Sequence, residues 1–291
     1  MNYRNLIAVA ALAVALPAAA QEVTLKIAHF LPSAAPTQQK VLQPWCDEMG
    51  KQSNGRIKCQ FYPAMQLGGT PAQLVDQVKN GVADVVWTGP GYSAGRFPVH
   101  TAKKEIVGLT GFAGMKLRTS TRVGAKTLAA LGGSPVAMPP AQVTEAIAKG
   151  VVDGSLGAWE LVFPTKLSEV TKFHAQPAAG VAHPTATVLT VLMNKAKYDG
   201  LPADLKAIVD KTTGEVMVGK FGAMFDDFAA DTRKRIAAQG NKITTFSATQ
   251  VAAMKQATAS VEDEWAKQVG EKGLDGKKLI ASARELTGTN K

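Results

Sequence analysis

The early part of the chain alternates between strand-like and helix-like patterns. Apolar side chains occupy every second position in residues 23–29 and 56–62, and residues 83–87 form a short apolar run like that of a buried parallel strand. Residues 38–51 space their apolar side chains three and four apart, and Pro71 opens a further helix at its first position. Strand, helix, strand, helix, strand in this order predicts a parallel α/β unit with right-handed crossovers.

An export signal precedes this unit. Arg4 supplies a positive charge, residues 6–16 form an unbroken apolar run, and residues 18–20 are the small residues that signal cleavage requires. A run of about 11 residues is too short to cross a bilayer of about 30 Å as a helix. We therefore expect cleavage near Ala20, a mature periplasmic protein that begins at Gln21, and no direct membrane insertion after cleavage.

The positive charge of the chain is scattered. The formal net charge is +10 over 291 residues, and the basic clusters at residues 103–104, 233–235 and 277–278 are short and lack interleaved aromatic side chains. Solvated helix faces account for these clusters better than a nucleic-acid surface does. We therefore expect no nucleic-acid partner, although a basic exported protein still attracts small anions.

The two cysteines fall in neighbouring predicted elements. Cys46 lies in the helix expected at residues 38–51 and Cys59 in the strand that follows it. These elements pack together in a βαβ unit, so an oxidising compartment favours a disulfide between the two residues. Two buried thiols are the alternative, and they would change nothing about function.

The alternating pattern continues to the C terminus. We expect helices at residues 120–131, 141–149, 248–267 and 276–286, and strands at residues 115–118, 135–138, 156–163 and 242–246. Residues 186–194 are the most β-branched run of the chain, long enough to pass through more than one sheet. Residues 202–239 are mostly helical in pattern and contain three glycines that can kink or divide the helix, Gly214, Gly219 and Gly222.

Arg118 is the first candidate for a ligand contact. A Gly-rich turn at residues 109–114 leads into the short strand, which delivers Arg118 to its carboxyl edge, where open α/β sheets hold ligands. A guanidinium has five donors in a planar fork that fits a carboxylate with two parallel hydrogen bonds. We therefore interpret Arg118 as a clamp for an organic anion, with an ordinary surface ion pair as the alternative.

One motif of the chain is typical of a hydrolase. Residues 91–95, Gly-Tyr-Ser-Ala-Gly, match the G-x-S-x-G nucleophile elbow, and His174 and His183 lie downstream as candidate bases. An elbow must pass straight into a helix, whereas Pro98 follows the motif closely. A serine hydrolase that uses Ser93 is therefore the alternative function, and we expect the chain not to be an enzyme.

Signals for cofactors and metals are absent from the sequence. No H-E-x-x-H, C-x-x-C, G-x-x-x-x-G-K-[ST] or G-x-G-x-x-G pattern occurs. The four histidines, His29, His100, His174 and His183, do not have the spacing of metal ligands. We expect no cofactor.

An ordered set of short motifs points to one family. The motifs are Ile-Ala-His-Phe-Leu-Pro at residues 27–32, Gln-Leu-Gly-Gly at 66–69, Asp-Val-Val-Trp-Thr at 84–88, Gly-Arg-Phe-Pro at 95–98, Gly-Met-Lys-Leu-Arg at 114–118, Val-Asp-Gly at 152–154 and Met-Asn-Lys at 193–195. Because these motifs occur in this order, the chain resembles the solute-binding proteins of tripartite ATP-independent periplasmic (TRAP) transporters, of the dicarboxylate-binding DctP type. No single motif is specific, but together they run through nearly the whole mature chain.

The resemblance implies a two-lobed periplasmic-binding-protein-like α/β fold. Each lobe would be a mostly parallel sheet flanked by helices, and the lobes would be joined by crossing strands and a long helix. We expect a signal peptide at 1–20, a first lobe at 21–99, a second lobe at 100–185, and shared elements at 186–291. The implied partners are a small organic acid, bound by lobe closure, and the membrane subunits of a TRAP transporter.

The resemblance also gives Arg118 the role of pairing with the ligand carboxylate. Other candidates come from strand ends and loops that would face the same gap: His29, Phe30, Gln73, Trp87, Tyr92, Pro139 and Trp159. By residue type alone the aromatic candidates fit a core as well, and a lone histidine is commonly structural. Several aromatic rings around one arginine favour an aromatic or branched acid over a small dicarboxylate.

One departure from the family concerns residues 98–101. Similar proteins carry a helical segment and a strand that crosses into the second lobe at this point, so this chain has an apparent internal deletion of about forty residues. Losing a central strand would leave unpaired backbone and an open apolar face. The family often places a second polar ligand contact in that strand. A degenerate member that transports nothing is therefore a further alternative.

Overall fold

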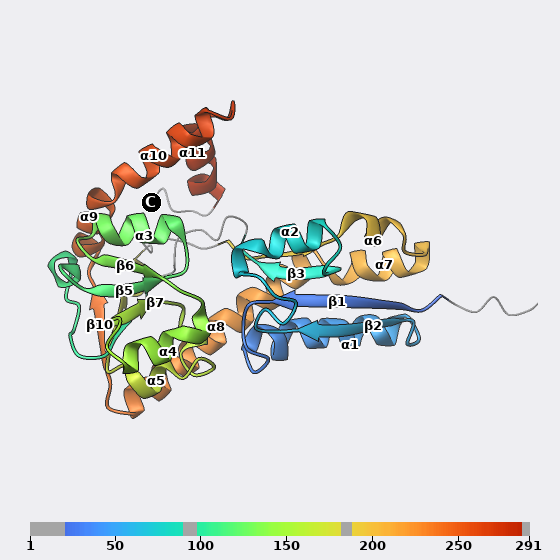
Figure 1. The fold of residues 1–291 in the computed structure, drawn as a ribbon, viewed down its shortest axis with the longest axis horizontal. Coiled ribbons are helices and arrows are strands. Elements are labelled where there is room, and N and C mark those ends of the chain that lie inside the picture. The colour runs from blue at the N-terminus through green and yellow to red at the C-terminus, as the bar shows by residue number, and fades with distance from the viewer. Residues whose placement is uncertain (1–20, 90–97, 182–187, 287–291) are drawn as a thin grey trace, which may run out of the picture.

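The computed structural model describes residues 21–89, 98–181 and 188–286, which form two α/β lobes (Figure 1). The first lobe contains the N-terminal strands, and the second contains most of the elements after residue 98. No helix within the described ranges is long and apolar enough to cross a membrane. The expected two-lobed fold is therefore present.

The first lobe is built on a four-stranded sheet of order β2-β1-β3-β9. Its strands are β1 (Val23–His29), β2 (Ile57–Tyr62), β3 (Val85–Thr88) and β9 (Thr190–Met193). β1 pairs in parallel with both β2 and β3, and β9 runs antiparallel to β3. The accompanying helices are α1 (Gln43–Gln52), α2 (Leu74–Lys79), α6 (Lys195–Asp199) and α7 (Ala203–Thr212). The predicted strand-helix rhythm of the N-terminal unit is confirmed.

The second lobe is built on a six-stranded sheet of order β10-β8-β4-β7-β5-β6. Its strands are β4 (Val99–Thr101), β5 (Lys116–Thr119), β6 (Ser134–Ala137), β7 (Gly154–Leu156), β8 (Phe173–Pro177) and β10 (Lys242–Phe246). Its helices are α3 (Arg122–Ala130), α4 (Pro140–Ala148), α5 (Leu167–Val170), α9 (Ala248–Ala257), α10 (Ala259–Gly270) and α11 (Gly276–Leu286). β4 is antiparallel to both of its neighbours, and the other pairings are parallel.

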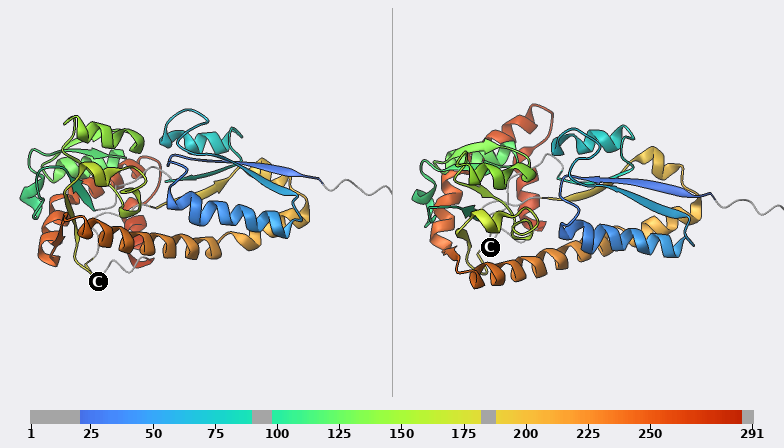
Figure 2. Two further views of the ribbon diagram at one scale, coloured as in Figure 1. Left: turned by 90° about the horizontal axis from the view of Figure 1, so that it is seen from below. Right: turned by 60° about the horizontal axis from the view of Figure 1, so that its bottom comes forward.

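The helix α8 (Glu215–Ala238) joins the two lobes and runs along one side of both (Figure 2). Met217 and Met224 are buried in the core of the first lobe, and Ile236 is buried in the core of the second. The predicted helical stretch is divided at Gly214, whose φ of 62° and ψ of −136° end the helical backbone between α7 and α8. Such a positive φ favours glycine.

The strand expected at residues 156–163 is wrong beyond Leu156. A helical turn at Trp159–Leu161 follows β7, and the next strand is β8, which periodicity did not indicate. β8 contains His174, Gln176 and Pro177, so it lacks an apolar alternation, and its partners β4 and β10 are distant in sequence. Of the β-branched run at residues 186–194, residues 190–193 form β9 in the first lobe, and residues 182–187 lie outside the described ranges.

The expectation that the second lobe lacks its central strand is wrong. Residues 99–101 form that strand themselves, with His100 opposite Ser155 of β7 on one side and His174 of β8 on the other. The approach of β4 and β7 requires glycine, because a Cβ at Gly154 would lie 2.2 Å from the carbonyl oxygen of His100. In the first lobe β9 pairs only with β3 among the described strands.

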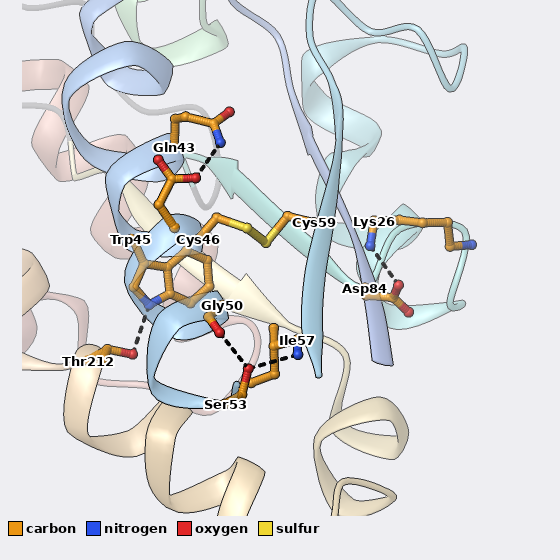
Figure 3. Close-up of a disulfide and its surroundings, with 11 residues drawn as sticks. Lys26, Gln43, Trp45, Cys46, Gly50, Ser53, Ile57, Cys59, Asp84 and Thr212 are labelled. Atoms are coloured by element: carbon orange, nitrogen blue, oxygen red, sulfur yellow. Dashed lines mark hydrogen bonds between the residues drawn. A yellow bond between two sulfur atoms is a disulfide. The ribbon is translucent and has the colours of Figure 1, made fainter. Parts of the chain in front are cut away.

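A disulfide joins Cys46 of α1 to Cys59 of β2, with the two Cα atoms 6.2 Å apart (Figure 3). Two hydrogen-bonded side chains hold α1 beside it. The indole Nε1 of Trp45 donates to Thr212 Oγ1 of α7 at 3.0 Å, and the Ser53 Oγ accepts from the backbone N–H of Ile57 at 2.9 Å. The disulfide therefore ties α1 to β2, the edge strand of the first sheet.

Replacing both cysteines by serine should lower the free energy of unfolding. The bond closes a short loop with a sequence separation of 13, and loop-closure entropy gives a loss of about 3 kcal/mol. Urea denaturation of the double variant and of the wild type measures this loss. Reduced wild-type protein should match the variant, and identical midpoints for oxidised and reduced protein would contradict the prediction.

Candidate ligand-binding cleft between the lobes

A cavity of about 490 Å³ lies between the two lobes. Its walls come from the segments that follow the carboxyl ends of β3, β5 and β6, together with the turn that precedes α2, and this is the edge at which open α/β sheets bind ligands. The first lobe contributes Thr70, Pro71, Ala72 and Gly89, and the second contributes Ser120, Thr121, Arg122, Ala125, Ala137, Met138 and Pro139. The cavity is therefore placed where a bound molecule would touch both lobes.

Local capping interactions shape these walls. The backbone N–H of Thr70 donates to Gln73 Oε1 at 2.8 Å, which closes a capping box at the Pro71–Gln73 turn. On the opposite wall the Thr121 Oγ1 accepts from the N–H of Gly124 at 2.8 Å and caps α3. The positive end of the α3 dipole thus borders the cavity, and it favours an anion there. Gln73 itself lies beside the cavity as the cap residue.

Arg118 is buried directly behind the second-lobe wall. Its side chain is on β5, opposite Val136 of β6 and Ser155 of β7, and the residue is 4% exposed. The Nε donates to the backbone carbonyl oxygen of Met138 at 3.0 Å, and Met138 lines the cavity. Burial and this hydrogen bond hold the guanidinium at the boundary of the cleft.

Arg118 belongs to a row of polar side chains that crosses the second sheet. His174, His100, Ser155 and Arg118 are aligned in register on the neighbouring strands β8, β4, β7 and β5. Residues aligned in this way share one face of a sheet. All four are buried, with exposed fractions of 0–4%. We call these four residues the polar row. Ala175, Val99 and Leu156, one register position away, face the apolar core on the opposite side.

The two histidines of the polar row form a hydrogen-bonded chain. A carbonyl only accepts, so the His100 Nε2 must donate to Gly157 O at 3.1 Å, and the neutral His100 Nδ1 is then an acceptor. The His174 Nδ1 lies 2.8 Å from that atom and therefore donates to it. The remaining His174 Nε2 accepts from Asn241 Nδ2, 3.4 Å away, while Asn241 also donates to Thr171 O. Both rings are satisfied only in the neutral state.

Burial strongly favours this neutral state. Desolvation, with a smaller contribution from the His174 charge, lowers the pKa of His100 from 6.5 to about 3, and desolvation lowers the pKa of His174 from 6.5 to about 4. At neutral pH Arg118 is accordingly the one formally charged member of the polar row. Sequence analysis missed this pair because its members are 74 residues apart, and no local pattern links them.

The structure places the aromatic candidates in packed surroundings. Trp159 is 4% exposed, donates from Nε1 to Gln176 Oε1 at 2.6 Å, and packs against the rings of His100 and His174. In the first lobe Phe30 stacks on Trp87 with ring centroids 5.0 Å apart, and both belong to the core. Their roles as ligand contacts stay predictions.

The remaining candidates lie in different environments. His29 is fully buried, donates from Nε2 to Gln38 Oε1 at 2.9 Å, and accepts from the N–H of Leu31. Desolvation lowers the pKa of His29 below its usual value. Pro139 lines the cavity between the lobes. Tyr92 and the residues 91–95 of the elbow motif lie outside the described ranges. Among the residues that the structure describes, no cluster of three or more side chains could bind a metal ion.

Two α/β lobes with a cavity between the carboxyl ends of their strands define a solute-binding protein. The chain belongs to the bacterial extracellular solute-binding protein family 7, called DctP, whose family model matches residues 27–100 and 92–268. It is a TRAP solute-binding protein of the DctP type, as the sequence motifs predicted. This family membership does not favour the hydrolase alternative.

Solved structures and a characterised relative agree on this family. The chain is 32% identical to a TRAP solute-binding protein from Rhodoferax ferrireducens T118 in complex with copurified benzoate, with a TM-score of 0.84 over 92% of this chain and 98% of that one. It is 34% identical to a marine-metagenome TRAP protein specific for aromatic acid ligands, with 3-hydroxybenzoate, at a TM-score of 0.84 over 92% and 99%. It is also 24% identical to the C4-dicarboxylate-binding periplasmic protein DctP of Rhodobacter capsulatus over 89% and 91% of the two chains.

The comparisons also agree with the short connection in this chain. The family match is split in two, and its parts overlap at residues 92–100, which follow β3 and end within β4. The alignment with the Rhodobacter protein runs over 311 positions but uses 89% of the 291 residues of this chain, or about 259. Roughly fifty positions of that alignment therefore face gaps in this chain.

Proposed function

We propose that this protein captures an aromatic carboxylate in the cleft between its lobes and delivers it to the membrane subunits of a TRAP transporter. The observation that carries the proposal is the placement of Arg118, a buried guanidinium hydrogen-bonded to the wall of that cleft. A carboxylate entering the cleft would take two parallel hydrogen bonds from the guanidinium. Gln73 and Pro139, on the two sides of the cavity, remain candidates for the secondary contacts.

The aromatic class of the ligand is supported by two considerations. Two compared structures, 32% and 34% identical to this chain, hold benzoate and 3-hydroxybenzoate. A cavity of about 490 Å³ is also within the range of small-molecule sites, roughly 300–1,000 Å³. A ring of benzoate size fits this volume, and its single carboxylate needs only one cationic partner.

Binding and closure form the mechanism, without a chemical step. An open and a closed arrangement of the lobes would exchange, and a ligand that touches both walls would shift the population toward the closed one. Desolvating a carboxylate is costly unless it is paired and hydrogen-bonded, which is the role of Arg118 and the α3 N-terminus. The neutral histidine pair adds no second charge to the polar row beside that of Arg118.

The cellular setting follows from the same proposal. The chain would be exported to the periplasm, lose its signal peptide near Ala20, and act as a binding protein and not as an enzyme. Residues 21–99 and 100–185 would act as the two lobes that move relative to each other, while β9 and α8, within 186–291, connect them.

A thermal-unfolding scan of residues 21–291 with a panel of acids tests the proposal. The panel contains benzoate, 3-hydroxybenzoate, a C4 dicarboxylate and a 2-oxo acid. A ligand that binds only the native state, at a concentration a hundred times its dissociation constant, adds about 2.7 kcal/mol to the free energy of unfolding. This raises the midpoint of thermal unfolding by roughly 5 °C or more. The aromatic acids should give this shift. A cooperative transition that no acid moves would favour the degenerate, non-transporting alternative.

A further inference from the structure

The first lobe contains a second cavity, of about 630 Å³, that is separate from the cleft. It lies between the β3 and β9 edge of the first sheet and the helices α7 and α8. Its apolar walls include Trp87, Val191, Met193, Met217, Phe221 and Phe225. None of the residues that line the cleft between the lobes lines this cavity.

Aromatic rings dominate one wall of this first-lobe cavity. The rings of Trp87 and Phe221 are stacked with centroids 6.4 Å apart, and Phe221 stacks on Phe225 at 6.1 Å. Such a ladder of rings offers flat apolar surface to a planar or aliphatic guest. The volume is also within the range that small-molecule sites occupy.

The charge at this cavity is negative. Asp210 lies on its lining, and the carboxylate accepts hydrogen bonds from the Tyr198 hydroxyl at 2.7 and 2.9 Å. No lysine or arginine is among the described residues that line the cavity. Asp210 is exposed, and the Lys206 Nζ lies 5.7 Å from the centroid of the Tyr198 ring but is not part of the lining. The lining itself therefore offers an anionic guest no cationic partner, whereas an uncharged guest would lose little on entering the cavity.

The first-lobe cavity lies at the edge of the first sheet and is open to solvent there. Its β9 wall ends the first sheet among the described strands, and its β3 wall precedes the point at which the family match is split. Val218 of α8, which lines the cavity, is 71% exposed.

We propose that the first-lobe cavity is a second ligand site that takes an uncharged aromatic or aliphatic molecule. The two sites of the protein then differ in chemistry. The cleft, with Arg118 and the α3 N-terminus, selects anions, whereas the first-lobe cavity, with its aromatic ladder and Asp210, selects neutral apolar compounds. Occupation of the second site does not depend on Arg118.

Two glycines of α8 allow a matched test of this site. Gly222 lines the cavity and Gly219, one turn earlier, does not. A Cβ added at either position meets nothing within 4 Å, and both positions are helical, so a side chain can start at each without a clash at its Cβ. Gly222→Leu places a side chain in the cavity, while Gly219→Leu makes the same change outside it. Both variants should unfold at or above the wild-type temperature.

The experiment is a fluorescence titration of the mature chain with N-phenyl-1-naphthylamine, an uncharged apolar probe. Saturable binding with one site per chain is expected. Gly222→Leu should weaken the apparent affinity about tenfold or more, while Gly219→Leu and Arg118→Ala should leave it within about twofold. In the Arg118→Ala background, 8-anilinonaphthalene-1-sulfonate, which adds a sulfonate to the same skeleton, should bind about tenfold or more weakly than the neutral probe.

Four results would overturn the proposal. The first is non-saturable binding of the neutral probe, and the second is equal weakening by the two glycine variants. The third is probe binding that falls as the protein concentration rises while sedimentation shows dimers, because the cavity would then be covered by a second copy of the chain. Preference for the sulfonated probe would equally contradict the assigned selectivity.

Discussion

Replacing Arg118 by alanine should weaken the binding of benzoate and 3-hydroxybenzoate by about thirtyfold or more while the protein stays folded. Removing one partner of a buried, hydrogen-bonded charge pair costs about 2–5 kcal/mol, which corresponds to a loss of affinity of roughly thirtyfold to several thousandfold. Isothermal titration calorimetry of the mature chain measures this loss. Circular dichroism and the thermal midpoint show whether the variant is folded.

Two further variants separate the role of Arg118 from general effects of charge and packing. Arg118→Lys keeps the positive charge but not the planar fork, so it should bind more tightly than Arg118→Ala and more weakly than the wild type. Arg122→Ala removes an exposed arginine that also lines the cleft, and it should change affinity only a few-fold because exposed charges are screened. Equal affinities for Arg118→Ala and the wild type would refute the proposed site.

The position of Arg118 could be predicted from sequence because the relevant constraints are local. A Gly-rich turn, a four-residue strand and the following helix place the side chain at the carboxyl edge of β5, and the capping Thr121 is also a local signal. The disulfide could be predicted for the same reason, since α1 and β2 are consecutive elements of one βαβ unit. Such units leave few alternative arrangements.

The centre of the second sheet could not be predicted because its pairing is not local. β4 has three residues, too few to show a period, and its partners β7 and β8 come more than fifty residues later. Trp159 illustrates the same limit. The apolar character of residues 156–163 was consistent with a strand, but Gly157 accepts a hydrogen bond from the distant His100, and a helical turn begins at Trp159. Tertiary contacts decided the local conformation there.

The polar row also shows how β4 is bonded at the centre of the second sheet. His100 stands between His174 and Ser155 at the centre of the sheet, and both of its ring nitrogens form hydrogen bonds. A buried polar network of this kind is stable only if every member is satisfied. The three residues of β4 therefore supply both the backbone pairing and the side-chain bonds that the central position requires, provided that the histidines stay neutral.

Acidification should therefore destabilise the protein already at pH values well above the pKa of its carboxylates. The pKa of His100 is about 3 and that of His174 about 4 in the folded state, against 6.5 in the unfolded chain. Between these values the unfolded chain binds more protons, so the free energy of unfolding is at its full value above pH 6.5 and falls as the pH is lowered toward 4. Lowering the pH from 7 to 5 should reduce the free energy of unfolding by about 2 kcal/mol for each of these two histidines.

Urea denaturation at pH 7, 6 and 5 measures this dependence, and His100→Gln identifies its source. The glutamine has no proton to gain, so the variant should lose about half of the contribution that the pair makes to the slope. It should remain less stable than the wild type at pH 7, because the bond to His174 is weakened. His29→Gln, which removes a buried histidine outside the row, should leave the contribution of the pair intact. A free energy of unfolding that is constant from pH 7 to pH 5 would mean that the pair is charged or solvated in the folded protein, because only a folded-state pKa near the unfolded value removes the linkage.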